Sequence, residues 1–150
     1  MPQHFKHYQV DRQIYTSTRT LVAAAHRLDN GAAVVLKVPQ PGQRGDQLEE
    51  KYAKEAHYRH ALGQGEIELS RHFGLPMLVI PDPEGKALRD VSHASESLSL
   101  SVWLKMARAA TQQIKELHAL GVVHRDVHPG NLLWKSTTEQ VALVDFELAV

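Results

Sequence analysis

A polar loop near the carboxyl end of the chain narrows its possible folds and functions more than any other segment. Residues 124–131 read His-Arg-Asp-Val-His-Pro-Gly-Asn, and residues 144–147 read Val-Asp-Phe-Glu. Two residues with metal-binding oxygens, Asn131 and Asp145, therefore flank a predicted strand pair, and Asp126 precedes Asn131 by five positions. Phosphoryl transfer needs one group that orients the acceptor hydroxyl and two that hold magnesium on nucleotide phosphates. The segment predicts a site of this kind.

Composition excludes several classes of protein. The chain has 150 residues, of which 43% are hydrophobic, and its 17 Lys and Arg balance its 17 Asp and Glu. A chain without net charge lacks the electrostatic footprint of a nucleic-acid-binding protein. Cysteine is absent, which excludes disulfides and thiol chemistry, and no apolar run reaches membrane-spanning length. We expect a soluble cytoplasmic protein that binds no nucleic acid and inserts into no membrane.

The amino-terminal third has the pattern of an antiparallel sheet. Residues 8–15, 18–26 and 32–38 are rich in β-branched and apolar side chains, which predicts two or three strands. Asn30-Gly31 precedes the last of these segments. This dipeptide accepts the positive φ angles of a two-residue hairpin loop, so it predicts a tight turn.

One helix interrupts the strands. Asp46 is predicted to cap this helix, Glu49 to complete a capping box, and Gly63 to end it. A second strand pair is predicted after the helix, at 66–70 and 77–80 with a turn at 74–76.

The remaining residues predict a second, more helical lobe. Residues 81–85, Pro-Asp-Pro-Glu-Gly, have the composition of a connector. A long helix is expected from about Leu100 to Leu120, capped by a nearby serine and ended by Gly121. Its predicted buried face consists of Leu100, Trp103, Leu104, Ala107, Ile114 and Leu117. The sequence thus predicts an α+β fold with a β-rich lobe at 1–82 and a partial helical lobe at 83–150.

Two charged residues occupy positions that the apolar pattern marks as buried. Lys37 lies in an apolar strand on the same face as Val35, and Glu55 belongs to a helical stripe that includes Tyr52. A buried ammonium without a partner is costly, so one interpretation pairs Lys37 with Glu55 across the sheet–helix interface. In the alternative, Lys37 extends to solvent at a strand end and Glu55 lies at the margin of the stripe.

These residues together resemble the eukaryotic-type (Hanks-type) serine/threonine protein kinase family. Residues 34–37, Val-Val-Leu-Lys, look like the lysine strand of that family, and Glu55 lies at a matching distance downstream. His124-Arg125-Asp126 followed by Asn131 matches the spacing of its catalytic loop. The resemblance covers essentially the whole chain. It implies a protein-kinase-like bilobal fold, in which an antiparallel N-lobe sheet with one αC-type helix precedes a partial helical C-lobe.

The resemblance also implies a role for each residue. Lys37 would hold ATP phosphates and Glu55 would orient Lys37, while Asp126 would act on the acceptor hydroxyl. Asn131 and Asp145 would hold Mg²⁺. Further ATP-binding residues implied by the resemblance are Val22, Val35, Ile80 and Asp82, with Ile80 behind the adenine and Pro81-Asp82 as the hinge. Besides the nucleotide, the implied partner is a protein substrate or a partner domain.

Four features depart from the family. The nucleotide-covering loop at 15–22 contains no glycine, which argues against close backbone contact with phosphate. His128, a further catalytic candidate, replaces a lysine and is similar to the histidine of aminoglycoside- and choline-type small-molecule kinases. Glu147 replaces a glycine and brings a negative charge towards the metal site. The chain stops at Val150, so we expect it to be a fragment of a longer polypeptide.

Several functions are consistent with these residues. The first is an ATP- and Mg²⁺-dependent serine/threonine protein kinase domain of a bacterial signalling protein. The second is a pseudokinase that binds nucleotide without catalysis, and the third is a small-molecule kinase. His124 and His128 have the spacing of a zinc-binding helix, but Pro129-Gly130 would end any helix there, so a zinc site is not expected. The acceptor, the oligomeric state and the effect of the glycine-free loop and Glu147 on catalysis are left open.

Overall fold

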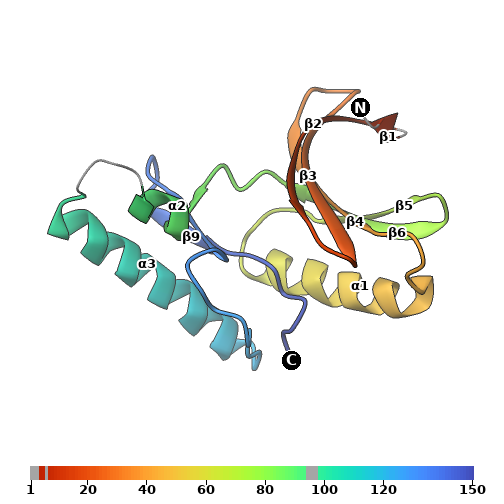
Figure 1. Ribbon diagram of the computed structural model, residues 1–150. Helices are drawn as coiled ribbons and strands as arrows, with labels where there is room; N and C mark the ends of the chain where they lie inside the picture. The colour runs from red at the N-terminus through yellow and green to blue at the C-terminus, as the bar shows by residue number, and fades with distance from the viewer. Residues whose placement is uncertain (1–3, 6, 94–97) are drawn as a thin grey trace. The chain divides into compact units, whose positions relative to one another are not determined.

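The computed structural model describes residues 4–5, 7–93 and 98–150 and has the predicted α+β architecture (Figure 1). The chain divides into two compact units, unit 1 at residues 1–82 and unit 2 at residues 83–150. Within the described residues, no helix is both long enough and apolar enough to cross a membrane.

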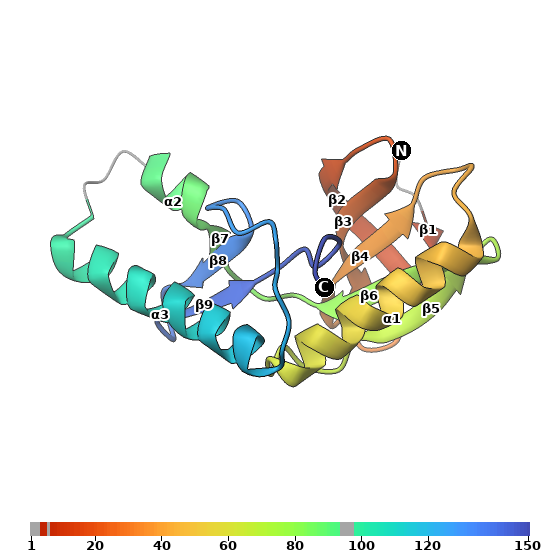
Figure 2. The same cartoon turned by 90° about the horizontal axis from the view of Figure 1, so that it is seen from below.

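The described part of unit 1 is a six-stranded antiparallel sheet with one helix. The strands follow the order β1-β2-β3-β4-β6-β5. Their bounds are β1 His4–Phe5, β2 Tyr8–Thr16, β3 Thr20–Arg27, β4 Ala33–Pro39, β5 Glu68–His72 and β6 Leu75–Pro81. Helix α1, Gly45–Ala61, packs along β6 and β5 (Figure 2).

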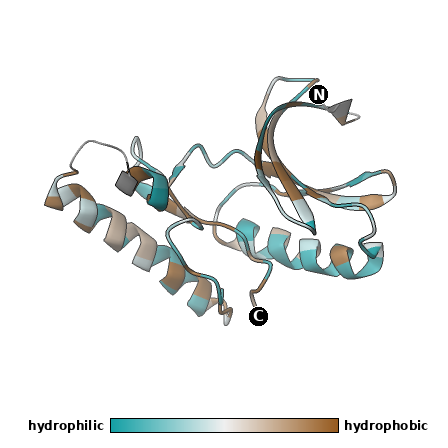
Figure 3. Ribbon diagram, viewed as in Figure 1, coloured by the Kyte–Doolittle hydropathy of each residue, from teal (hydrophilic) through white to brown (hydrophobic). Residues whose placement is uncertain are grey.

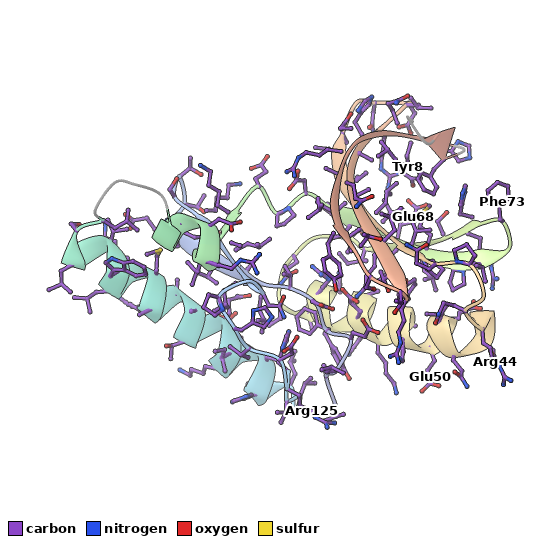
Figure 4. All side chains as sticks on the ribbon, viewed as in Figure 1. Tyr8, Arg44, Glu50, Glu68, Phe73 and Arg125 are labelled. Atoms are coloured by element: carbon purple, nitrogen blue, oxygen red, sulfur yellow. The ribbon has the colours of Figure 1, made fainter. Side chains whose placement is uncertain are left out.

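The sheet curves until its two edges meet. The Phe5 ring lies 4.2 Å from the His72 ring, which joins β1 to β5. Near this contact, Tyr8 Oη donates a hydrogen bond of 3.3 Å to Glu68, and Arg27 Nη2 lies 2.7 Å from the same carboxylate. Figure 4 shows Tyr8 and Glu68 directed toward one another. The concave face encloses one apolar core, made of Phe5, Tyr8, Ala25, Val34, Leu36, Val38, Met77 and Val79.

The opposite face of the sheet packs against α1. Leu78 and Ile80 of β6 form a second buried cluster with Tyr52 of the helix, and Val35 of β4 packs against it. In Figure 3 most of α1 is coloured hydrophilic. Two of the three buried side chains of this helix, Glu55 and Arg59, are charged. The helix is therefore held to the sheet by a buried ion pair, Lys37–Glu55, as well as by apolar contact.

Two of the hairpin turns of unit 1 differ from the sequence prediction. Between β3 and β4, Arg27 N–H bonds to Ala32 O, and this bond closes a loop of four residues, 28–31. Gly31 in this loop adopts φ 72°. A two-residue turn occurs instead between β5 and β6, where Phe73 has φ 48° and Gly74 has φ 80°. Positive φ at both positions matches the twist of the strands. The predicted turn at 74–76 is thus wrong by one to two residues.

Helix α1 ends as predicted but begins differently. Its N-cap residue is Arg44, which makes no side-chain cap bond, so the predicted capping box of Asp46 and Glu49 is absent. At the other end Gly63, with φ 72°, follows the last turn. Gly63 N–H bonds to His60 O and Gln64 N–H to Arg59 O, the two bonds of a Schellman motif.

Unit 2 contains a small sheet and two helices among its described residues. The strand order is β7-β8-β9, with bounds β7 Lys86–Ala87, β8 Leu132–Lys135 and β9 Gln140–Leu143. The helices are α2, Leu88–His93, and α3, Leu100–Ala119, of which α3 packs against β9. The hairpin β8–β9 was predicted, whereas β7 and α2 were missed because a two-residue strand and a six-residue helix carry too little periodicity.

Helix α3 has the predicted ends and a different buried face. Ser99 accepts a bond from Val102 N–H at the start, and Gly121, with φ 74°, follows the end. The predicted face is wrong at Leu100, Trp103, Leu104 and Ala107, which are exposed, whereas Leu117 is buried as predicted. The residues of α3 that are buried are Met106, Ala110 and Leu117.

The start of unit 2 requires a glycine at position 85. A Cβ atom there would lie 2.9 Å from Leu133 Cβ and 3.3 Å from the Trp134 carbonyl oxygen, both of which belong to β8. We expect Gly85→Ala to lower the free energy of unfolding of unit 2 by about 1–3 kcal/mol, as overpacking does, measured by urea denaturation. The control is Gly45→Ala, whose Cβ would meet Leu75 at an ordinary 3.7 Å. Equal stability of the two variants would contradict the expectation.

Candidate functional site

The buried ion pair of unit 1 is the first element of the site. Lys37 Nζ on β4 lies 2.8 Å from Glu55 Oε2 on α1, and the two residues are 6% and 2% exposed. The predicted partner of Lys37 is thus the observed one. Arg59, one helical turn after Glu55, contacts the other carboxylate oxygen, with Nε and Nη2 each 2.9 Å from Oε1. Glu55 is therefore paired with two cations rather than one.

These cations set the ionisation of Glu55. Burial alone would raise the pKa of Glu55, since a charged carboxylate loses its water. The Arg59 guanidinium and the Lys37 ammonium outweigh this effect and hold the pKa of Glu55 below its ordinary value. Glu55 is therefore charged near neutral pH.

Strand register places four of the predicted ATP-site residues on one face of the sheet. Val22 pairs directly with Lys37, and Val35 pairs directly with Ile80. Directly paired residues of antiparallel strands point to the same side, as do residues two apart in one strand. Val22, Val35, Lys37 and Ile80 consequently all lie on the face that carries α1.

The predicted hinge offers few hydrogen-bond donors. Asp82 follows β6, and its N–H donates to Ala33 O at 3.2 Å, which continues the pairing of β4 with β6. Pro81 has no N–H. A base edge at this position would have to be met by carbonyl oxygens.

The glycine-free loop between β2 and β3 bonds to itself. Ser17 Oγ accepts the N–H groups of Arg19 at 3.2 Å and of Thr20 at 3.0 Å. Backbone N–H groups in such a loop are the groups that could contact phosphate. In this structure Ser17 occupies two of them.

His124 organises the loop of unit 2. This residue is 2% exposed, and its Nε2 lies 3.0 Å from Val144 O while its Nδ1 accepts Asp126 N–H at 3.3 Å. The Phe146 ring packs edge-on against the His124 ring at 5.0 Å. Both ring nitrogens therefore contact the backbone, so His124 joins the loop to the strand end.

Asn131 connects the two halves of the loop. Its Nδ2 donates to Asp126 O at 3.0 Å and to Asp126 Oδ2 at 3.1 Å. These bonds orient the half-buried Asp126 carboxylate. Because the amide nitrogen of Asn131 is used on Asp126, its amide oxygen is the atom suited to a metal.

The β8–β9 hairpin brings Asn131 and Asp145 to the same end of its two strands. Leu132 pairs with Leu143, and Val144 N–H bonds to Asn131 O at 2.9 Å just beyond that pair. Asp145 adopts φ 62° and Arg125 adopts φ 68°. Such backbone costs about 1 kcal/mol or more in residues other than glycine and collects at functional sites. Arg125 is exposed on the loop (Figure 4).

His128 faces the Asp126 carboxylate. His128 Nε2 lies 3.7 Å from Asp126 Oδ2, and Nδ1 accepts Gly130 N–H at 3.0 Å. A Cβ at Gly130 would lie 2.8 Å from the His128 ring, so glycine permits this fold of the loop. Asp126, His128 and Asn131 thus form one cluster in unit 2.

The donor set of unit 2 suits magnesium better than zinc. Among the described residues, no three His, Cys, Asp or Glu side chains gather as a metal site. Magnesium does not need such a cage, since it is commonly bound by one or two protein oxygens together with substrate phosphates and water. Asn131 and Asp145 are the residues that would hold it.

Two residues contribute to the site without having been predicted from the sequence, Arg59 and Phe146. Arg59 was given no role, although an arginine four residues after a buried glutamate is a pairing signal. The packing of Phe146 on His124 could not be recognised from residue spacing in the sequence, because the two rings come from segments about twenty residues apart.

Comparison with known proteins identifies the family. The model of the protein kinase domain matches residues 8–150. The chain is 33% identical over 85 residues to serine/threonine-protein kinase PknB of Mycobacterium leprae (strain TN), and 35% identical over 85 residues to PknA of Mycobacterium tuberculosis (strain ATCC 25177 / H37Ra). The chain belongs to the protein kinase family. Its fold is the protein-kinase-like bilobal α+β fold that the sequence predicted.

The similarity covers part of each protein. The aligned residues are 57% of this chain, but only 13% of PknB and 20% of PknA. The chain therefore spans a small fraction of the length of these relatives.

Proposed function

We propose that the chain provides the nucleotide-binding and catalytic-loop part of an ATP- and Mg²⁺-dependent serine/threonine protein kinase in bacterial signalling. The observation that carries the proposal is the buried Lys37–Glu55 pair at 2.8 Å. Burying an ammonium and a carboxylate costs free energy that an apolar pair would avoid. A lysine retained there at that cost is suited to binding an anion such as a phosphate chain.

Each residue has a role in this proposal. Unit 1, residues 1–82, is the N-lobe, where Lys37 binds phosphate oxygens and Val22, Val35 and Ile80 contact the base. Unit 2, residues 83–150, is a partial C-lobe, where Asp126 orients the acceptor hydroxyl and accepts its proton. Bound Mg²⁺ would neutralise phosphate charge. Asn131 and Asp145 hold the cation, and His128 contacts Asp126.

The partners and the cellular compartment follow from the same proposal. Nucleotide is one partner and a protein substrate is the other, and the site lies in the cytoplasm, where ATP is available. The absence of net charge argues against nucleic acid as a further partner.

One observation favours a pseudokinase as the second candidate. Ser17 occupies the N–H groups of Arg19 and Thr20 in the loop that would cover the phosphates. Without amide contacts, nucleotide would bind through Lys37 and the metal, and turnover could be lost while binding persists.

Magnesium-dependent ATP binding tests both candidates. We expect ATP with Mg²⁺, but not ATP with EDTA, to raise the melting temperature of the protein. Asp145→Asn removes a negative metal ligand and should reduce the Mg²⁺-dependent part of this shift at least about tenfold in apparent affinity. The matched control, Asp29→Asn, changes an exposed loop residue.

The outcomes separate the proposals. No ATP-dependent shift in the wild-type protein excludes both the kinase and the nucleotide-binding pseudokinase. A shift without phosphoryl transfer to any protein substrate supports the pseudokinase. Equal shifts for Asp145→Asn and Asp29→Asn would show that Asp145 is not a metal ligand.

A further inference from the structure

Arg59 is a buried cation to which the proposed chemistry gives no role. Its side chain is about as buried as that of Lys37. Nε and Nη2 both lie 2.9 Å from Glu55 Oε1, while Lys37 Nζ lies 2.8 Å from Oε2. Each oxygen of the carboxylate therefore has its own cation.

The guanidinium is also fixed from its other side. Arg59 Nη1 donates to Gln64 Oε1 at 3.0 Å. Gln64 in turn bonds its N–H to Arg59 O in the cap that ends α1. Because the planar guanidinium is bonded at both edges, Arg59 holds Glu55 Oε1 in one position.

From these contacts we propose that Arg59 is a positioning residue for nucleotide binding. It fixes the Glu55 carboxylate with Oε2 toward Lys37 and Oε1 toward Arg59 itself, which limits the hold of Glu55 on the Lys37 ammonium when phosphate oxygens bind. This inference rests on the proposed function and adds a residue to the nucleotide site.

The physical reason is competition for one ammonium. A buried carboxylate and a phosphate both attract Lys37, and the attraction is strong where water is excluded. The positive charge of Arg59 offsets part of the charge of Glu55 and so weakens its hold on Lys37. Without Arg59, Glu55 would turn both oxygens toward Lys37 and compete better with phosphate.

The test uses Arg59→Leu, Arg59→Lys and Arg71→Leu. Leucine fills the site with apolar volume but removes one partner of a buried ionic cluster, which costs about 3–5 kcal/mol, so Arg59→Lys, which keeps the charge, is the second variant and the folding of both is checked by circular dichroism. Arg71→Leu is the matched control, because Arg71 pairs with Glu49 at 2.6 Å on the surface. Mg²⁺-ATP affinity is measured by calorimetry. We expect about tenfold weaker binding for Arg59→Leu, the lower end of the loss seen when a ligand loses its supporting partner, partial rescue in Arg59→Lys, and no change in Arg71→Leu.

A pH profile separates positioning from simple support of the fold. Lys37 faces Glu55 from β4 and Arg59 faces it from α1. Strand β6 carries no titratable side chain, and on β5 Glu68 is paired with Arg27 and Arg71 with Glu49. Loss of Arg59 removes a charge that keeps Glu55 ionised, and a protonated Glu55 no longer competes for Lys37, so the loss of Mg²⁺-ATP affinity in Arg59→Leu relative to the wild-type protein should become smaller as the pH falls. If Arg59 only supported the fold, the pH dependence of Mg²⁺-ATP binding would be the same in Arg59→Leu and in the wild-type protein.

The results bear on the two proposals separately. If the wild-type protein binds Mg²⁺-ATP and Arg59→Leu binds it equally with the same pH profile, the role of Arg59 is excluded and the proposed function stands. If the wild-type protein does not bind Mg²⁺-ATP, the proposed function is excluded and the role of Arg59 falls with it.

Discussion

Asp126→Asn is expected to lower the rate of phosphoryl transfer by about 10²- to 10⁴-fold, the contribution of a positioned general base. The asparagine retains an oxygen that can accept the bond from Asn131 Nδ2, now 3.1 Å from Asp126 Oδ2. The loop should therefore keep its geometry and lose only the basic carboxylate. The rate is measured as transfer of labelled phosphate from ATP to a generic protein substrate and to the chain itself.

Two measurements make this expectation specific. Mg²⁺-ATP should still raise the melting temperature of Asp126→Asn, because Asn131 and Asp145 rather than Asp126 are the proposed metal ligands. Asp90→Asn is the matched control, since Asp90 is an exposed aspartate on α2 with a weak contact to Arg89 at 3.6 Å. Full activity in Asp126→Asn would show that Asp126 does not accept the proton of the hydroxyl.

Glu55→Ala is expected to have the largest effect on stability. Removing this carboxylate takes the shared anion from two buried cations, Lys37 and Arg59. Breaking a buried ionic cluster in this way costs about 3–5 kcal/mol. The free energy of unfolding is measured by urea denaturation, followed by circular dichroism. Glu49→Ala on the same helix is the control, because its pair with Arg71 is exposed and contributes about 1 kcal/mol or less.

Acid titration of stability provides a second measurement on Glu55. The pKa of Glu55 is lower in the folded protein than its ordinary value of 4.5, mainly because the charges of Arg59 and Lys37 outweigh burial. The ionised group therefore stabilises the fold above about pH 4.5, and this contribution is lost as the pH falls through the folded pKa. Glu55→Gln should lack this part of the pH dependence. An unchanged acid profile in Glu55→Gln would contradict the assignment.

The sequence predicts the elements of the site well because charges in apolar segments are unambiguous signals. Lys37 in an apolar strand and Glu55 in an apolar stripe each require a partner, and the structure pairs them at 2.8 Å. The glycines that end the helices are equally clear, since Gly63 and Gly121 both adopt positive φ. The metal-binding roles of Asn131 and Asp145 stay predictions, although the register of β8 and β9 brings the two residues together.

Other features could not be predicted because the deciding interaction lies elsewhere in the chain. On α3, one stripe contains Leu100, Trp103 and Leu104, and another contains Met106 and Ala110. Both stripes are apolar, so periodicity alone favours neither. The second stripe is the buried one, and α3 packs against β9. The turn at Phe73 was missed because a large side chain rarely adopts positive φ.

The distribution of aromatic residues has a practical consequence for spectroscopy. All four tyrosines, Tyr8, Tyr15, Tyr52 and Tyr58, belong to unit 1, and both tryptophans, Trp103 and Trp134, belong to unit 2. Trp134 is buried in the small sheet and Trp103 is exposed on α3. Indole emission therefore reports on unit 2 alone. Energy transfer from phenol to indole depends on the distance between the rings, so the unlabelled protein can report any change in the separation of its two units.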